Sequence, residues 1–284
     1  MTFKTFTPRD SMLRGMRDCV LRGYTLPRTP GGRSSLAPRP PWHYAGDCLA
    51  VEFEADAAAL AALLPPPLEL ADGRCCAYFI EWQFATDDGE EILDPVTSQY
   101  KETIFLVSGR YRGEDVAFCP FIWVDQDVSL MRGLIQGWPK QIGSTWITRA
   151  YEVPGKASSR HAPGGRFGAS LAAKDRRLAE ARVTLREPSA SLPRPSFASA
   201  VNVRLFPNLS AERPDRPALH ELVRLKSRDV QVGPIMKGEA SLELHDHPRL
   251  ELAMLRPRKT GSGYRFSFAL TVDDLEMLAD LRAA

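Results

Sequence analysis

One stretch organises this sequence: Gly137-Trp138-Pro139-Lys140-Gln141-Ile142-Gly143. It holds a single lysine between a proline and two glycines, in a chain whose 37 basic residues are mostly arginines. An ammonium group in apolar surroundings is poorly solvated, so its pKa falls and a neutral amine that can attack a ketone becomes available. Pro139 fixes φ and the glycines relax the backbone, which suits a constrained turn that aims one side chain. The same composition also fits a surface turn with a solvated lysine.

Residues 132–143 extend this stretch to Arg-Gly-Leu-Ile-Gln-Gly-Trp-Pro-Lys-Gln-Ile-Gly. They resemble the lysine loop of the acetoacetate decarboxylase superfamily, in which an aromatic-Pro-Lys-Lys-x-Gly motif carries the Schiff-base lysine. The resemblance continues in chain order through the segments 47–53, 57–64, Pro65-Pro66-Pro67-Leu68 and Tyr100-Lys101-Glu102. We therefore expect residues 38–284 to form an acetoacetate decarboxylase-like domain and residues 1–37 to form an N-terminal extension or arm.

The pattern of short apolar runs favours a mainly β fold of the α+β class. Antiparallel sheets, closed or nearly closed into a cone or barrel with a few peripheral helices, fit this pattern, and the family resemblance implies the same around an apolar pocket. We expect helices over residues 57–64, capped by Asp56, and 275–281, capped by Thr271 or Asp273. The expected strands are residues 48–53, 77–84, 102–108, 116–124 with a bulge or sheet edge at Pro120, 144–153, 166–172, 178–185, 240–244, 250–255 and 264–270.

Composition favours one large domain that acts on a small molecule. A chain of 284 residues with 44% hydrophobic content can bury a substantial core. The 37 basic and 35 acidic residues leave a net charge of +2, and no long basic block carries interleaved aromatics. Nucleic acid and membrane surfaces are therefore poor candidates as partners.

The cysteines and the N-terminal residues indicate the cellular compartment in which we expect the protein. Five cysteines, an odd number without paired zinc spacing, indicate reduced and mostly buried thiols in a cytoplasmic protein: Cys19, Cys48, Cys75, Cys76 and Cys119. Residues 1–23 mix both charges without an apolar core, which is not typical of a secretory signal, and no stretch approaches the roughly 20 apolar residues that span a bilayer. The Pro-rich segment 24–41 should form an extended arm, and this arm and the family both suggest a homo-oligomer, a dimer or tetramer.

Glu102 is the second candidate catalytic residue after Lys140. A Schiff-base enzyme needs a group that shuttles protons through carbinolamine, imine and enamine, and a carboxylate near the amine can do this. The resemblance implies that Glu102 matches the family's catalytic glutamate, whereas the residues alone also fit a solvated carboxylate at a strand end. Further candidates for substrate contact are Tyr100 and Gln136 as hydrogen-bond partners, Trp138 as a pocket wall, and Gln141.

Two departures from the family pattern bear on the reaction. Acetoacetate decarboxylase itself, whose lysine is activated by desolvation or an adjacent cation, has a second lysine after the reactive one, and this sequence has Gln141 there. Any further cation must then come from elsewhere, for instance Lys101 or Arg132. Gly46 stands where the decarboxylase has an active-site arginine. With these departures the pattern resembles the branch of the superfamily that condenses pyruvate with an aldehyde and dehydrates the product.

Other chemistries find little support. His245 and His247 have a spacing that could hold a metal, but without a further clustered ligand a polar hairpin turn is the favoured interpretation. The Gly-rich segment 164–168 lacks the strand-loop-helix context of a phosphate loop. We therefore expect a lysine Schiff-base lyase with no metal and no organic cofactor, acting on pyruvate and an aldehyde. Decarboxylation of acetoacetate or another 3-oxo acid is the first alternative, and a non-catalytic small-molecule binding protein is the second.

Overall fold

The computed structural model describes residues 20–209, 213 and 216–283. Its contacts divide the chain into two compact units, Met1–Arg39 and Pro40–Ala284. The first part of the expected extension, with Cys19, lies outside the described residues. Within the first unit the chain folds back on itself, because Arg22 pairs with Thr29 and the Thr25 hydroxyl donates to the carbonyl of Ala37 at 3.3 Å. The expectation of an extended arm is therefore wrong for this segment.

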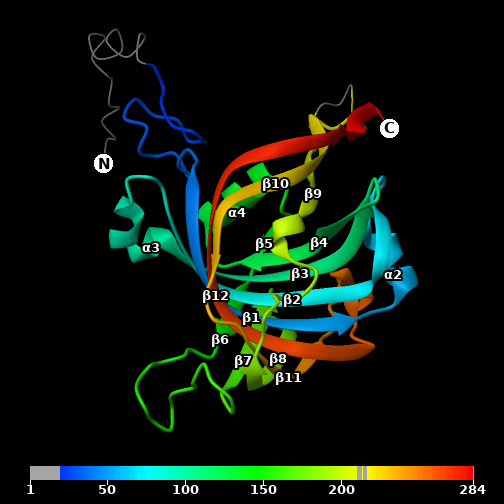
Figure 1. Cartoon of the computed structure of the whole chain (residues 1–284). Helices are drawn as coiled ribbons and strands as arrows, with labels where there is room; N and C mark the ends of the chain where they lie inside the picture. Colours follow the sequence, from blue (N-terminus) through cyan, green and yellow to red (C-terminus); the bar gives the residue numbers. More distant parts are fainter. Residues whose placement is uncertain (1–19, 210–212, 214–215, 284) are drawn as a thin grey trace, which may run out of the picture. The chain divides into compact units, whose positions relative to one another are not determined.

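The second unit is built around one twelve-stranded sheet (Figure 1). The strands are β1 (Trp42–Glu54), β2 (Glu69–Ala85), β3 (Gln99–Tyr111), β4 (Glu114–Val124), β5 (Lys140–Ile142), β6 (Ser144–Ile147), β7 (Arg166–Ala173), β8 (Arg176–Pro188), β9 (Val201–Phe206), β10 (Leu219–Val232), β11 (Met236–Leu244) and β12 (Lys259–Asp280). The helices are α2 (Ala57–Leu63), α3 (Pro95–Ser98) and α4 (Asp127–Gln136), with short 3₁₀ turns η1 (Glu90–Leu93), η2 (Phe197–Ser199), η3 (Glu251–Leu255) and η4 (Leu281–Ala283). None of the helices in the described part is long and apolar enough to cross a bilayer.

The strand order is β5-β4-β3-β2-β1-β12-β11-β8-β7-β6, and β10 pairs with both β12 and β9 off this path. All these pairs are antiparallel except β4 with β5, so the expected mainly β, antiparallel architecture is confirmed, with one parallel pair. Within the described ranges no ladder joins β5 to β6. The sheet is therefore open at these strands, and the expected closed or nearly closed barrel is not confirmed.

Both faces of the central strands are buried, in two separate clusters of apolar side chains. Along β1, Leu49 and Val51 belong to one cluster, whereas Cys48 and Ala50 belong to the other, as the alternation of side chains across a strand requires. Figure 1 shows β12 bending away from the central strands, so that its second half forms a separate layer with β9 and β10. The candidate site lies between this layer and the central strands of the sheet.

Several local predictions are confirmed. Asp56 caps α2 by accepting a hydrogen bond from the Ala59 N–H at 2.9 Å, and α2 ends before the triple proline. In β4 the register against β3 shifts between Phe118 and Phe121, which places a bulge at Pro120. The four cysteines in the described residues are buried free thiols.

Three predictions about elements are wrong. The strand expected over residues 144–153 ends at Ile147. Residues 251–255 of the strand expected over 250–255 form η3. Residues 275–280 of the expected capped helix continue β12, and η4 follows from Leu281. Pairing of β12 with β10 from Glu221 to Arg228 overrides the helical propensity of that last segment. The sequence interpretation also missed α4 and the strands β9 and β10. It also missed β5, the short strand that Lys140 opens.

Candidate active site

Helix α4 and strand β5 together aim Lys140 into the second unit. Gly137 ends α4 with φ of 84°, a left-handed conformation that glycine adopts without steric cost, and the N–H of Trp138 donates to the carbonyl of Gly133 at 2.9 Å. The chain then turns sharply through Pro139, so that Lys140 starts β5 beside Ile122 of β4. The predicted role of this stretch as a constrained turn is confirmed.

Gly133 makes room for the lysine side chain. A Cβ added at Gly133 would lie 2.3 Å from Cδ of Lys140 and 2.6 Å from its Cγ. Glycine in a helix interior costs about 1 kcal/mol relative to alanine. Glycine at this position therefore does not stabilise α4. It leaves the space in which the methylene groups of Lys140 cross the helix.

Lys140 and Glu102 form a buried ion pair. The Lys140 Nζ lies 2.6 Å from Oε2 of Glu102 and donates to the Ser129 Oγ at 3.0 Å. The side chains of Lys140 and Glu102 are only 8% and 4% exposed. Trp82 donates from its indole Nε1 to the other carboxylate oxygen at 3.0 Å. Glu102 is thus held between a tryptophan and the amine, within hydrogen-bond reach of any group bonded to Nζ.

Burial lowers the pKa of Lys140, because the ammonium loses its hydration. The carboxylate of Glu102 opposes this effect, and the positive charge of Arg132 adds to it. The net direction is downward, which raises the fraction of neutral amine at a given pH. This is the property that a Schiff-base lysine needs.

Of the two candidate cations, Arg132 is the one whose positive charge lowers the pKa of Lys140. Its side chain is 1% exposed, and its guanidinium carbon lies 3.6 Å from the ring centroid of Phe84 and 5.4 Å from those of Tyr44 and Tyr100. Among the described residues its three guanidinium nitrogens have no hydrogen-bond partner. The other candidate cation, Lys101, has its Nζ 3.8 Å from the ring centroid of Trp146.

The ion pair opens into a cavity, here named the inner cavity, that runs between the sheet and the layer of β10 and β12. Of the predicted substrate-contacting residues, Tyr100, Gln136 and Trp138 line it beside Lys140 and Glu102, whereas Gln141 does not. Gln141 follows Lys140 along β5 and so points to the opposite face. The remaining lining residues are Tyr44, Tyr78, Trp82, Ile104, Leu192, Ser196, Phe197, Leu225, Ser227, Val230, Val232, Phe266, Phe268, Leu270 and Val272.

A second hollow, here named the outer cavity, shares four wall residues with the inner one: Trp82, Tyr100, Val232 and Phe268. Its charged lining residues are Asp47, Glu81, Lys101, Asp125 and Arg149. The two cavities therefore border the same wall, but only the inner one contains the buried amine.

Gly46 has no side chain at the place where the indole of Trp82 packs against β1. A Cβ at Gly46 would lie 2.6 Å from Cε3 of the Trp82 indole, so a larger side chain cannot share this space without moving the ring. The position at which the decarboxylase pattern has an arginine is thus given over to the indole that holds Glu102. The loss of the arginine at position 46 is thus coupled to the presence of Trp82, because Gly46 leaves room for the indole.

The family model described as acetoacetate decarboxylase (ADC) matches residues 25–281. The chain belongs to the acetoacetate decarboxylase family. Among curated relatives, the acetoacetate decarboxylase of Chromobacterium violaceum is 25% identical over 258 residues, 89% of this chain and 92% of that protein. Acetoacetate decarboxylase 1 of Bradyrhizobium diazoefficiens is 24% identical over 259 residues, 90% of this chain and 93% of that protein.

Two solved structures are more similar to this family member. The enduracididine biosynthesis enzyme MppR, complexed with the condensation product of pyruvate and imidazole 4-carboxaldehyde, has 38% identity and a TM-score of 0.86 over 92% of this chain and 98% of its own. An acetoacetate decarboxylase-like enzyme from Sphingomonas wittichii RW1 has 27% identity and a TM-score of 0.84 over 91% of this chain and 100% of its own. The predicted membership of the superfamily, on the side of MppR, is confirmed, and the chain is a lyase of the Schiff-base type.

Sequence reasoning missed the contributions of Ser129 and Gly133, and it left the role of Arg132 open. Together with Gln136 these residues recur at helical spacing on the face of α4 that meets Lys140. Recognising residues 127–136 as a helix would have grouped them. For Trp82 the sequence carried no signal, because its partner Glu102 lies on the neighbouring strand, 20 residues away.

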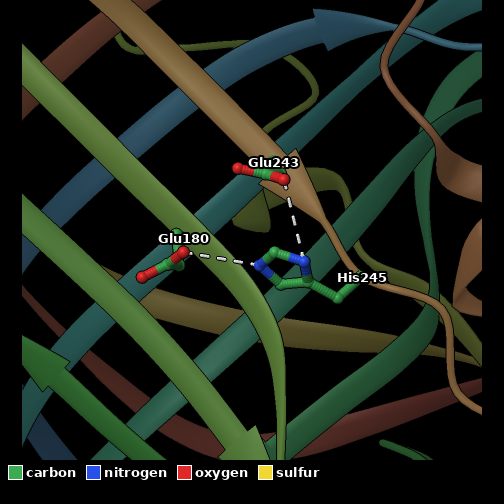
Figure 2. Close-up of side chains that lie close together, drawn as sticks. All are labelled: Glu180, Glu243 and His245. Atoms are coloured by element: carbon green, nitrogen blue, oxygen red, sulfur yellow. Dashed lines mark ion pairs between the residues drawn. The ribbon is translucent and has the colours of Figure 1, made fainter.

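The histidines do not assemble a second site. His245 lies with Glu180 and Glu243, not with His247 (Figure 2). Figure 2 shows the two carboxylates on opposite nitrogens of the ring, with Nε2 3.4 Å from Glu180 and Nδ1 3.8 Å from Glu243. A metal binds one ring nitrogen at a time, so this arrangement favours ion pairing of the imidazole over a shared metal site.

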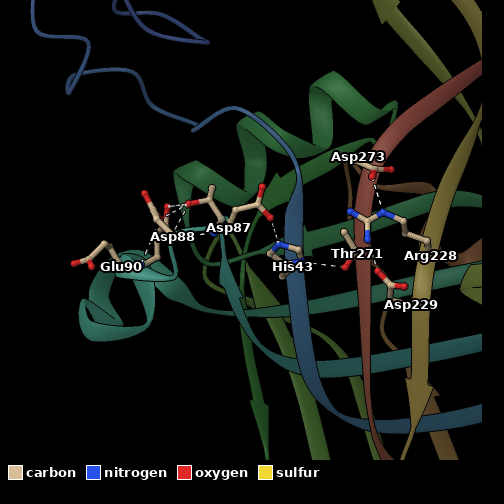
Figure 3. Close-up of polar contacts among 10 residues, drawn as sticks. His43, Asp87, Asp88, Glu90, Arg228, Asp229, Thr271 and Asp273 are labelled. Carbon is tan, nitrogen blue, oxygen red and sulfur yellow. Dashed lines mark hydrogen bonds and ion pairs between the residues drawn. The ribbon is translucent and has the colours of Figure 1, made fainter.

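His43 and Arg228 fasten strands at one edge of the layered region (Figure 3). His43 of β1 lies 2.9 Å from both the Thr271 Oγ1 and the Asp87 Oδ1, and Arg228 donates to Asp273 at 2.7 Å. The order Asp, His, Thr resembles a hydrolytic triad, but Thr271 is 4% exposed. Its hydroxyl is thus closed to a substrate, and these contacts tie β1, β10 and β12 together.

Proposed function

We propose that this enzyme condenses pyruvate with an aldehyde through an enamine on Lys140 and then eliminates water. The observation that carries the proposal is the buried pair of Lys140 and Glu102, 2.6 Å apart, in a chain 38% identical to MppR. One group supplies the nucleophile and the other moves every proton that the reaction requires.

In the first half of the reaction, the neutral amine attacks C2 of pyruvate and forms a C–N bond. Glu102 holds the proton that Lys140 gave up to become a neutral amine, and it passes this proton to the former carbonyl oxygen. It then takes a proton from the nitrogen and gives it to the hydroxyl, which leaves as water. The iminium that results is an electron sink. Glu102, again a carboxylate, removes a proton from the C3 methyl group, and the C–H electron pair forms the enamine.

In the second half, C3 of the enamine attacks the aldehyde carbon, and the oxygen that becomes an alkoxide takes the proton held by Glu102. Glu102 next removes the second proton from C3, and the β-hydroxyl leaves as water after protonation. Hydrolysis of the conjugated imine releases an unsaturated 2-oxo acid and restores the free amine of Lys140. Each proton removed is returned, so no oxidant or metal is needed for balance.

The charges around the amine support an oxo acid as the first substrate. The pair of Lys140 and Glu102 has no net charge, either with its shared proton on Lys140 or after that proton has passed to Glu102. The positive charge of Arg132 is therefore left in excess. Arg132 is buried and, as far as the structure is described, unpaired. An uncompensated buried cation is costly, and a single substrate carboxylate in its field reduces that cost.

Product analysis tests this proposal. The enzyme is incubated with pyruvate and benzaldehyde, and the expected product has the summed mass of both less one water, with formation that depends on Lys140. Acetoacetate is tested in parallel, because the curated relatives are acetoacetate decarboxylases. Release of carbon dioxide from acetoacetate without any condensation product from pyruvate would overturn the proposal in favour of decarboxylation.

A further inference from the structure

The wall of the inner cavity beyond the ion pair is a continuous run of aromatic rings. The ring of Phe197 lies 4.4 Å from that of Tyr78 and 5.9 Å from that of Phe268, measured between centroids. Phe268 in turn lies 5.0 Å from Trp82, whose indole binds Glu102. An apolar surface thus leads directly from the reacting groups to η2.

This wall is held in place before any substrate binds. Tyr78 is 1% exposed and donates from its hydroxyl to the carbonyl of Pro195 at 2.7 Å. Burial raises the pKa of this hydroxyl well above its usual range, so it stays protonated as a donor. The bond anchors the segment that carries Phe197, and a preorganised apolar wall binds a complementary group with little loss of conformational freedom.

The rest of the lining adds aliphatic side chains, the amide of Gln136 and the hydroxyl groups of Ser196 and Ser227, and no further charge. Lys140 and Glu102 are the charged members of the lining set. Once an oxo acid has bound, Lys140 is held in the imine and Glu102 moves protons. The carboxylate of that acid also balances the excess charge of Arg132. No group on this wall is then left to pair with a charge on the second substrate, and a desolvated, unpaired charge is costly.

We infer that the second substrate of this site is an uncharged, apolar aldehyde that bears an aryl or branched alkyl group. This inference rests on the proposed condensation and names the class of its electrophile. Aryl groups gain from offset or edge-on contacts with rings such as Phe197 and Phe268. This cavity should therefore bind an apolar aldehyde more tightly than a polar or ionisable one.

Three benzaldehydes test the inference, with an isopropyl, a carboxylate or a guanidinium group at the para position. The kcat/KM for each is measured at saturating pyruvate and divided by its rate with a simple amine, which removes differences in intrinsic reactivity. We expect the isopropyl compound to be preferred over both charged compounds by about 100-fold. A preference below tenfold over either one would overturn the inference.

A charge added to the wall should change this order. Val232 lines the inner cavity and is 39% exposed, so Val232→Arg places a cation there at little cost to folding. The kcat/KM for the carboxylate compound should rise at least tenfold. Met277→Arg is the matched control, because Met277 is 58% exposed and lies outside the lining. An equal rise in both variants would contradict a role for this wall.

A binding measurement separates this inference from the proposed reaction. The matching benzyl alcohols cannot condense, and their binding is followed by quenching of tryptophan fluorescence, since Trp82 and Trp138 line the cavity. Tighter binding of the isopropyl alcohol supports the inference even if no product forms, in which case only the proposed reaction fails. Equal binding of all three alcohols overturns the inference whatever the activity.

Discussion

The inner and outer cavities border the same four wall residues, yet they hold their lysines in opposite environments. Lys140 is buried beside Glu102, with its pKa lowered by desolvation. Lys101 lies in the outer cavity over the ring of Trp146. Residues 101 and 102 are neighbours on β3 and point to opposite faces of the sheet. The two lysines thus differ in burial, and burial is the main cause of the lowered pKa of Lys140.

Replacing each lysine gives the largest contrast between the two cavities. Lys140→Met should lower condensation activity by roughly 10⁴-fold or more, since nothing replaces a lost nucleophile. Lys101→Met should keep activity within about twofold of the parent, because Lys101 is only partly buried and does not line the inner cavity. Steady-state kinetics with pyruvate and benzaldehyde measures both, and circular dichroism controls for folding. Full activity of Lys140→Met would refute the assignment of the nucleophile.

Replacing the two glutamates gives the next contrast. Glu102→Gln should reduce turnover by about 10³-fold, because it removes the proton shuttle. It should also move the pH midpoint of adduct formation downward, since the carboxylate raises the pKa of Lys140. Glu81, 25% exposed at the outer cavity and 3.8 Å from Arg149, serves as the control through Glu81→Gln. A midpoint that rises in Glu102→Gln would contradict this electrostatic account.

Gly133→Ala tests whether the lysine stem needs the gap in α4. Alanine favours the helix by up to about 1 kcal/mol, so the protein should fold, but the added Cβ displaces Lys140. A reacting group misplaced by about 1 Å can lower activity by about 10²-fold. Gly155→Ala is the matched control, because a Cβ there meets nothing within 4 Å. Thermal melts and kinetics are compared, and unchanged activity with a normal melt would show that the gap is dispensable.

Arg132→Met should have the smallest effect, a shift in pH dependence. Its positive charge lowers the pKa of Lys140, so removing it should raise the pH midpoint of adduct formation with pyruvate. The KM for pyruvate should rise as well, since the charge that attracts the carboxylate is gone. Arg149→Met removes an exposed guanidinium at the outer cavity and should change neither value. An unshifted midpoint in Arg132→Met would mean that burial alone tunes the amine.

Much of the sheet could be predicted because short apolar patterns in the sequence identify its strands. Alternating or continuous apolar runs marked β1 to β4, and Asp56 with the triple proline marked both ends of α2. Segments whose structure depends on distant pairing were not predictable in this way. The end of β12 has helix-forming residues, and only its pairing with β10 makes it a strand.

The site was predictable only where chemistry and family pattern coincide. Lys140 and Glu102 were singled out by the resemblance, and the structure brings them together at 2.6 Å. The supporting residues come from other elements: Trp82 from β2, and Ser129 and Gly133 from α4. Their importance is set by contacts across the fold, which no local pattern encodes.

The most direct test of the account is the intact mass of the protein after borohydride reduction in the presence of pyruvate, with the modified peptide mapped after digestion. Reduction of an imine fixes the oxo acid to the amine. We predict one pyruvate-sized adduct per chain, on Lys140, which disappears in Lys140→Met and persists in Lys101→Met. An adduct on Lys101, or none on the parent protein, would contradict the claim that the buried amine of the inner cavity is the reactive one.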